Sequence, residues 1–382
     1  MKTEYIIIKN KGDLDHINDL SLNKKKIFFL YPGLYDKNYS SYKFNTHDKI
    51  TDNEQLYLLK KVNRVHSKLT KNISNISILS KANKANLRHF SINALSAFFY
   101  TDYLISKITP CWIYSNNKWK RYNDKKKISS ILFDHIFFEK KLIHFGVPTF
   151  NKGNVIHKIM VNFILLLLKK KKIVVFSEFN PAFFQIAKIL YKKKDIISIT
   201  FVNNKKNYFL NYLSNIIKIL NPFKNHSALD INLLMSKNSN TKTKIKKILS
   251  DLNIRELKPF KKNLTLILSK ATNYQNQIEP FVDCFFEKLD VKLYMSHHTR
   301  GIISPVIAEV SNNYGIKSIL IPHGTLPKFG DVKFDYLINE ISMGFVEDIF
   351  SSKIISQSKI TEYFIKKKYP KKKFKRFQPI TW

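Results

Sequence analysis

From about residue 172 onward, short apolar runs alternate with longer segments whose apolar residues recur at helical spacing. Runs of four to eight β-prone residues predict strands, and the 3.6-residue period predicts helices between them. The predicted strands are 173–177, 196–202, 231–235, 264–269, 291–295, 316–321, 353–356 and 374–380. Strands that alternate with helices in this way are typical of a doubly wound, mostly parallel sheet. The sequence therefore predicts a Rossmann-like α/β domain over residues 173–382.

The first 150 residues follow a different pattern. Two strands are predicted near the start, and long amphipathic helices follow them. The strands are 5–9 and 26–31, the helices are 54–69, 87–108 and 128–145, and 116–127 reads as a charged loop. Because strands and helices do not alternate clearly here, we expect a mixed α/β N-terminal domain over residues 1–150, whose role the sequence does not indicate.

Residues 151–172 read as an apolar and basic helical connector between these domains. The longest apolar run, Phe163 to Leu168, is far shorter than the roughly 20 residues that a membrane-spanning helix needs. Four lysines, Lys169 to Lys172, follow it. We expect a buried helix, and a segment that dips into a membrane surface is the second interpretation.

The charge of the chain is strongly positive, with 66 Lys and Arg against 28 Asp and Glu and a net charge of +38. Taken alone, this favours nucleic acid or an anionic membrane surface as a partner. The lysines are spread along the chain, and no recognised nucleic-acid-binding module appears, so specific nucleic-acid binding is not expected. Two cysteines give neither a disulfide framework nor metal-ligand spacing.

One stretch, 291–344, carries five of the nine glycines and three of the eleven histidines. It reads as strand, helix and strand, with Ser304 as the helix N-cap, Pro305 at the first helical position and Gly315 after its end. A right-handed crossover places the loops after both strands at one edge of a parallel sheet, where ligands bind in such folds. We therefore expect His298 and His323 to face one crevice.

His323 is the main candidate for catalysis because a histidine at a strand end can act as a general base. Gly324 would let backbone amides approach a substrate, and Thr325 would orient the imidazole or bind substrate. His298 is the second candidate. Since His297 and His298 are neighbours on a strand, only one of them is expected to face the crevice.

Further substrate-binding candidates lie on the same predicted edge. Arg300 and Gly301, near a helix start, suit an anionic group, with an ordinary surface arginine as the alternative. Lys328 follows the His323 loop, and Glu178 and Asn180 follow the strand 173–177, where a plain helix-capping loop is the alternative. No dinucleotide-binding, Walker or serine-nucleophile motif occurs, so no cofactor is expected. No metal site is expected either.

The segment YGIKSILIPHGT, preceded by the helix SPVIAEVSNN, resembles bacterial GT-B-type transferases of cell-surface polysaccharide and teichoic acid biosynthesis. HGTLPKFGD is similar to the HGTPxK motif of the CDP-glycerol glycerophosphotransferases. The matching residues are His323, Gly324, Thr325 and Lys328, whereas Leu326 and Pro327 stand in reversed order and Pro322 replaces the usual aromatic residue. The resemblance covers about 173–382. It implies a nucleotide-activated donor, His323 as the base and no obligatory metal.

Three functions follow as hypotheses. The first is a transferase that moves a sugar or polyol phosphate from a nucleotide donor to a glycan or lipid-linked acceptor, in the cytoplasm or peripherally on the inner membrane face. The second is a non-catalytic protein that binds nucleotide-sugar, glycan or a partner, because a donor-binding half is expected after the motif and none is found. The third is a basic nucleic-acid-binding protein.

Overall fold

The computed structural model describes most of the chain, with gaps. The described residues are 4–22, 25–29, 43–44, 51–77, 79–134, 155–178, 181–190, 195–202, 208–220, 226–230, 245–246, 249, 255–322, 350–356, 359, 362–363, 366 and 373–376.

The chain forms two compact units, each assembled from separate segments. The first unit comprises 1–68, 92–144 and 256–263, and the second comprises 69–91, 145–255 and 264–382. Three long helices supply residues to both units: α2 (Asp52–Ser74), α3 (Lys81–Ile108) and α9 (Lys261–Lys288). The units therefore differ from the contiguous division at residues 150 and 172 that the sequence suggests.

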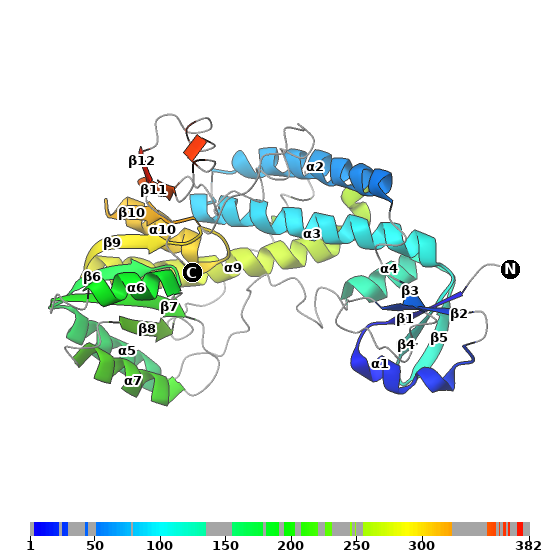
Figure 1. The fold of residues 1–382 in the computed structure, drawn as a ribbon, viewed down its shortest axis with the longest axis horizontal. Coiled ribbons are helices and arrows are strands. Elements are labelled where there is room, and N and C mark those ends of the chain that lie inside the picture. Colours follow the sequence, from blue (N-terminus) through cyan, green and yellow to red (C-terminus); the bar gives the residue numbers. More distant parts are fainter. Residues whose placement is uncertain are drawn as a thin grey trace. The chain divides into compact units, whose positions relative to one another are not determined.

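The second unit is built around a seven-stranded sheet (Figure 1). Its order is β12-β11-β10-β9-β6-β7-β8, and every described pair of neighbours is parallel. The strands are β6 (Lys172–Phe176), β7 (Ile196–Val202), β8 (His226–Asp230), β9 (Asp290–Ser296), β10 (Lys317–Leu320), β11 (Lys353–Ser356) and β12 (Lys373–Arg376). The chain runs outward from β6 to β8, returns to β9 beside β6, and then runs outward the other way. This is the order of a doubly wound Rossmann-like sheet, with its topological switch point between β6 and β9.

Helices cover both faces of this sheet. The helices of this unit include α5 (Val155–Leu168), α6 (Pro181–Leu190), α7 (Tyr208–Leu220) and α10 (Ile303–Asn313). Phe183 of α6 stacks on Phe176 of β6, with ring centroids 4.8 Å apart. On the opposite face, Phe285 of α9 meets Phe201 of β7 edge to face at 5.1 Å. Because Phe176 pairs with Thr200 in the parallel register, Phe176 and Phe201 point to opposite faces. The prediction of a Rossmann-like, mostly parallel α/β sheet is confirmed.

Two predictions within this unit are wrong. The apolar run at 264–269 is not a strand, because it lies inside the 28-residue helix α9 and is buried along most of its length. A short apolar run is ambiguous between strand and buried helix, and the packing of α9 resolves it. In addition, Ser304 is not an N-cap. The helix α10 begins at Ile303, and the Ser304 hydroxyl donates to the carbonyl of His298 instead.

The predicted turn at the other end of α10 is confirmed. Gly315 adopts φ +65°, in the left-handed region that favours glycine. Its amide donates to the carbonyl of Asn312 at 3.1 Å, and the amide of Ile316 donates to the carbonyl of Ser311 at 2.8 Å. The helix therefore stops there and the chain enters β10.

The first unit contains a five-stranded sheet of order β3-β2-β1-β4-β5. Its elements include β1 (Glu4–Ile8), α1 (Lys11–Asp15), the 3-10 turn η1 (Ile17–Asp19), β2 (Lys25–Phe29), β3 (Lys43–Phe44), β4 (Cys111–Ser115), β5 (Lys118–Tyr122), α4 (Lys125–Asp134) and the 3-10 helix η7 (Arg255–Phe260). The strands β3, β2, β1 and β4 pair in parallel, and β5 pairs antiparallel with β4. This sheet also reverses its order, between β1 and β4.

The expected charged loop at 116–127 is wrong. Asn116 and Asn117 form a two-residue hairpin turn, since Ser115 pairs with Lys118 and both asparagines have positive φ. The rest of the segment is β5 and the start of α4. An Asn-Asn pair between β-prone runs is a hairpin signal that the charge of the segment obscures.

The connector helix α5 is buried on one side only. Ile164 and Leu168 are buried, whereas Ile159, Phe163 and Leu166 are exposed. Within the described ranges, none of the helices has both the length and the apolar character to cross a membrane.

Candidate functional site

The switch point of the second unit brings two loop ends together. Ser177, directly after β6, donates its amide to the carbonyl of Met295 at 2.9 Å. Its hydroxyl accepts a hydrogen bond from the amide of His297 at 3.0 Å. The first residues after β6 and after β9 are therefore tied to one another at the carboxyl edge of the sheet, where ligands bind in doubly wound folds.

Glu178 lies between two histidines at this edge. Its Oε2 is 3.5 Å from Nε2 of His298, and its Oε1 is 3.8 Å from Nε2 of His297. The side chain of His297 is 5% exposed, whereas those of His298 and Glu178 are 29% and 41% exposed. Solvent and a ligand can therefore reach Glu178 and His298, while His297 supports the carboxylate from the interior.

Of the two neighbouring histidines only His298 is accessible, but strand alternation is not the reason. The strand β9 ends at Ser296, so His297 and His298 belong to the loop after it. Strand alternation, which would point neighbouring side chains to opposite faces, no longer applies there.

The hydrogen bonds of the His298 ring fix its orientation. The amide of Arg300 donates to Nδ1 of His298 at 3.4 Å. In the neutral imidazole one nitrogen accepts and the other carries the proton, so Nε2 bears the hydrogen that faces Glu178. A carboxylate and a backbone amide therefore hold this histidine in one tautomer.

The same loop holds a partly buried positive charge. Burial lowers the pKa of the Arg300 guanidinium to about 10, so it is still protonated at neutral pH. Next to it, Thr299 is 4% exposed, and its Oγ1 has no hydrogen-bond partner among the described residues. A cation shielded from water interacts more strongly with an anion than a surface arginine does.

The backbone of the loop is fixed by three features. Gly301 adopts φ +74°, a conformation that side-chain-bearing residues rarely adopt. The buried side-chain amide of Gln275 donates through Nε2 to the carbonyl of Ile302 at 3.1 Å. The Tyr294 hydroxyl lies 2.7 Å from the Ser304 hydroxyl, which in turn donates to the carbonyl of His298. The loop between β9 and α10 is thus anchored from α9, β9 and α10.

Four of the residues predicted from the sequence meet at this edge. They are Glu178, His298, Arg300 and Gly301. Five others lie outside the described residues, so their roles stay predictions: Asn180, His323, Gly324, Thr325 and Lys328. The sequence analysis missed Ser177, whose position directly before Glu178 was the available signal, and it considered His297 only as the neighbour of His298.

Across the described parts of the chain, no three His, Cys, Asp or Glu side chains are arranged to hold a metal ion.

Comparison with known proteins finds no matching family model and no matching curated protein. Among solved structures, a ketoreductase domain from the bacillaene assembly line aligns over 97% of this chain and 90% of that chain, at 8% sequence identity and a TM-score of 0.21. A score this low carries no functional argument, and the description of the fold rests on its own strand order.

Proposed function

We propose that this chain is a transferase of cell-surface polysaccharide biosynthesis. It moves a sugar or a polyol phosphate from a nucleotide-activated donor to a glycan or lipid-linked acceptor. The donor binds at the switch point between β6 and β9. The observation that carries the proposal is the group formed there by Glu178, His298 and Arg300.

The anionic part of the donor meets Arg300 in this proposal. A nucleotide donor carries phosphates, and guanidinium groups bind phosphate oxygens strongly. The half-exposed His298 lies beside Arg300 in sequence and in the loop, and it is held by Glu178. Because Nδ1 already accepts a backbone hydrogen bond, His298 positions the donor rather than taking a proton.

The general base is His323 in this proposal. Its support is the His-Gly-Thr sequence after β10, a strand that pairs directly with β9. Carboxyl ends of neighbouring parallel strands meet at one edge, so the loop after β10 begins beside the loop after β9. An acceptor hydroxyl bound there would lose its proton to the imidazole.

Calorimetric titration of the full chain with UDP-sugars, CDP-sugars and CDP-glycerol tests donor binding. We expect at least one donor to bind, and Arg300→Gln to weaken that binding by roughly ten- to hundredfold. Arg64→Gln is the matched control, since it removes an exposed arginine of the first unit that pairs with Glu256. If none of these donors binds to the chain, the proposal is wrong.

A turnover assay with any donor that binds separates the two leading hypotheses. His323→Ala should abolish transfer and leave the donor dissociation constant unchanged, because a general base acts on the acceptor. Transfer that survives His323→Ala at the wild-type rate refutes the assignment of the base. Donor binding without any turnover by the wild-type chain supports the non-catalytic binding protein instead.

We also propose that the chain works peripherally at an anionic membrane surface. The helices α5 and α7 pack against each other (Figure 1). Each exposes apolar side chains at i, i+4 and i+7. The exposed residues are Ile159, Phe163, Leu166, Leu213, Ile217 and Leu220. The exposed Lys169 and Lys170 follow α5 directly. Apolar faces bordered by lysine are typical of helices that lie in a membrane interface.

A further inference from the structure

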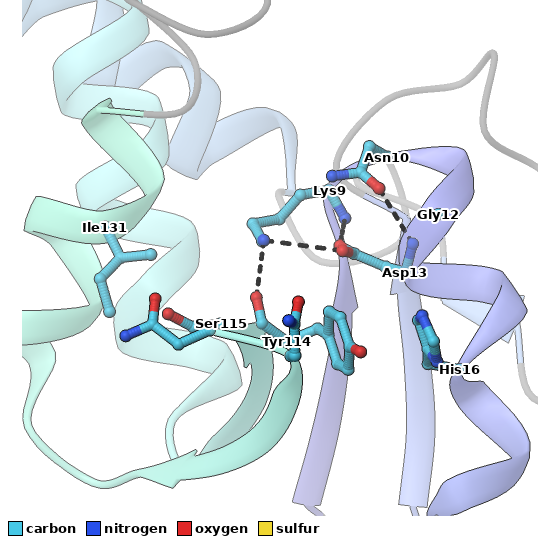
Figure 2. Close-up of a pocket in the computed structure, with 10 residues that line it drawn as sticks. Lys9, Asn10, Gly12, Asp13, His16, Tyr114, Ser115 and Ile131 are labelled. Atoms are coloured by element: carbon cyan, nitrogen blue, oxygen red, sulfur yellow. Dashed lines mark hydrogen bonds and ion pairs between the residues drawn. The ribbon is translucent and has the colours of Figure 1, made fainter.

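The first unit has a pocket at its own switch point (Figure 2). The pocket has a volume of about 400 Å³ and lies where β1 and β4 end. Its walls come from the segment after β1, through α1, and from the hairpin after β4. The lining residues are Lys9, Asn10, Gly12, Asp13, His16, Tyr114, Ser115, Asn116, Asn117 and Ile131. Both the position and the size are those of ligand sites in α/β folds.

The charged groups of the pocket satisfy one another. The ammonium of Lys9 lies 3.6 Å from Oδ1 of Asp13 and donates to the carbonyl of Tyr114 at 2.8 Å. The amide of Lys9 donates to Oδ2 of Asp13 at 2.7 Å. Figure 2 shows the Lys9 side chain reaching from β1 to β4 in this way. Since the cation and the anion are paired and nearly buried, the pocket offers no net charge to a phosphate or a carboxylate ligand.

The aromatic groups are also occupied by one another. The rings of His16 and Tyr114 stack at 4.6 Å with an angle of 10° between their planes. Trp119 meets Tyr114 at 5.3 Å and 63°. These three rings therefore leave no slot in which a flat nucleobase could be held between two ring faces.

The remaining lining residues are uncharged, and apart from Gly12 and Ile131 they carry hydrogen-bonding side chains. Asn116 and Asn117 have φ of 53° and 56°, which are the values of a tight two-residue hairpin turn. The two carboxamides of that turn line the pocket together with the hydroxyl of Ser115. Asn10 lines it from the side of α1, where its Oδ1 accepts a hydrogen bond from the amide of Asp13 at 2.9 Å (Figure 2). A carboxamide both donates and accepts, so it can bind the hydroxyl groups of a polyol in either direction.

We propose that this pocket binds an uncharged, hydroxyl-rich ring of about the size of a monosaccharide. Matched charges disfavour an anionic ligand, the self-stacked rings disfavour a nucleobase, and the fixed carboxamides suit vicinal hydroxyls. The proposal does not depend on the transferase function, because it requires binding and no turnover.

Saturation-transfer NMR of the full chain tests the proposal, with glucose, galactose and N-acetylglucosamine as probes. Inorganic phosphate and adenosine serve as the charged and the aromatic comparison. We expect at least one sugar to bind, and adenosine and phosphate not to compete with it. A chain that binds none of the three sugars overturns the proposal, as does displacement of a bound sugar by adenosine or phosphate.

The double variant Asn116→Gly/Asn117→Gly locates the binding. Glycine keeps the positive φ of the turn without strain while both carboxamides are lost. Affinity for the bound sugar should fall by roughly tenfold, as expected when hydrogen bonds to a ligand are removed. Asn75→Gly, at an exposed turn after α2, is the matched control. If the double variant binds the sugar as tightly as the wild type, the sugar does not bind in this pocket.

Discussion

Single residues set the geometry of the loop after β9. His298 is held between a carboxylate and a backbone amide, and Ser177 ties the amide of His297 to the end of β6. Gly301 then turns the chain into α10 with φ +74°. Its neighbourhood is open, since a Cβ built there would meet nothing within 4 Å. The requirement for glycine is therefore conformational rather than steric.

Gly301→Ala should cost about 1 kcal/mol in the free energy of unfolding, because alanine in the left-handed region is strained. Gly315→Ala is the matched variant, with φ +65° and an equally open neighbourhood at the other end of α10. Both variants should lose similar stability in urea denaturation. Only Gly301→Ala should weaken donor binding, and an equal effect of both on binding would show that the loop does not shape the site.

Partly buried polar side chains join whole elements to one another. The carboxylate of Glu309 in α10 accepts hydrogen bonds from the amides of Lys81 and Ala82 at 2.9 and 2.7 Å, so it caps the N-terminus of α3. At the edge of the sheet, Nδ1 of His226 in β8 lies 3.0 Å from the hydroxyl of Ser198 in β7. Burial, and to a lesser extent the charge of Lys218, lower the pKa of His226 to about 4.

This pKa predicts a pH dependence of stability. The folded form binds the proton of His226 less well than the unfolded form, whose pKa is near 6.5. The stability that the folded protein gains from keeping His226 neutral is therefore fully present above pH 6.5. It is lost as the pH falls from 6.5 toward 4. We expect His226 to account for up to about 3 kcal/mol of that loss.

His226→Asn tests this pH dependence, because the asparagine oxygen can accept from Ser198 and does not titrate. The difference in unfolding free energy between wild type and variant should shrink as the pH falls from 6.5 to 4. A constant difference between wild type and His226→Asn across this range would contradict the assigned cause.

At the scale of the whole molecule, the proposed membrane binding combines the charge of +38 with the exposed apolar faces of α5 and α7. Each lysine near an anionic bilayer contributes about 1 kcal/mol to the free energy of membrane binding, and salt screens this contribution. The apolar side chains contribute by leaving water, which salt does not weaken. Membrane binding should therefore persist at moderate salt, whereas binding through charge alone should not.

Cosedimentation with vesicles checks this difference. Vesicles that contain phosphatidylglycerol should bind the chain at about 0.15 M salt, and pure phosphatidylcholine vesicles should bind it weakly. Leu166→Ser/Ile217→Ser should reduce binding by roughly tenfold or more, whereas Tyr57→Ser, at an exposed position of the first unit, should not. Binding to duplex DNA that survives the same salt, without vesicle binding, would favour the nucleic-acid hypothesis instead.

The amino-acid sequence by itself determined the class of the second unit. Several strands there begin and end within a residue of their predicted positions, including β6, β7 and β11, because their apolar runs are strong local signals. Local signals also indicated Gly315 as a left-handed residue and the edge that carries Glu178, His298 and Arg300. Local patterns failed at 264–269 and 116–127, where β-prone residues lie in a buried helix and charged residues lie in a hairpin.

Only the tertiary structure decided which strand ends become neighbours. The strands β6 and β9 are more than a hundred residues apart, and their pairing creates the switch point that joins Glu178 to both histidines. The same is true of β1 and β4, whose pairing creates the pocket of the first unit. Periodicity reports which face of each element is buried, but it carries no information on the order of strands in a sheet. That order is fixed by long-range packing, and it places the candidate sites.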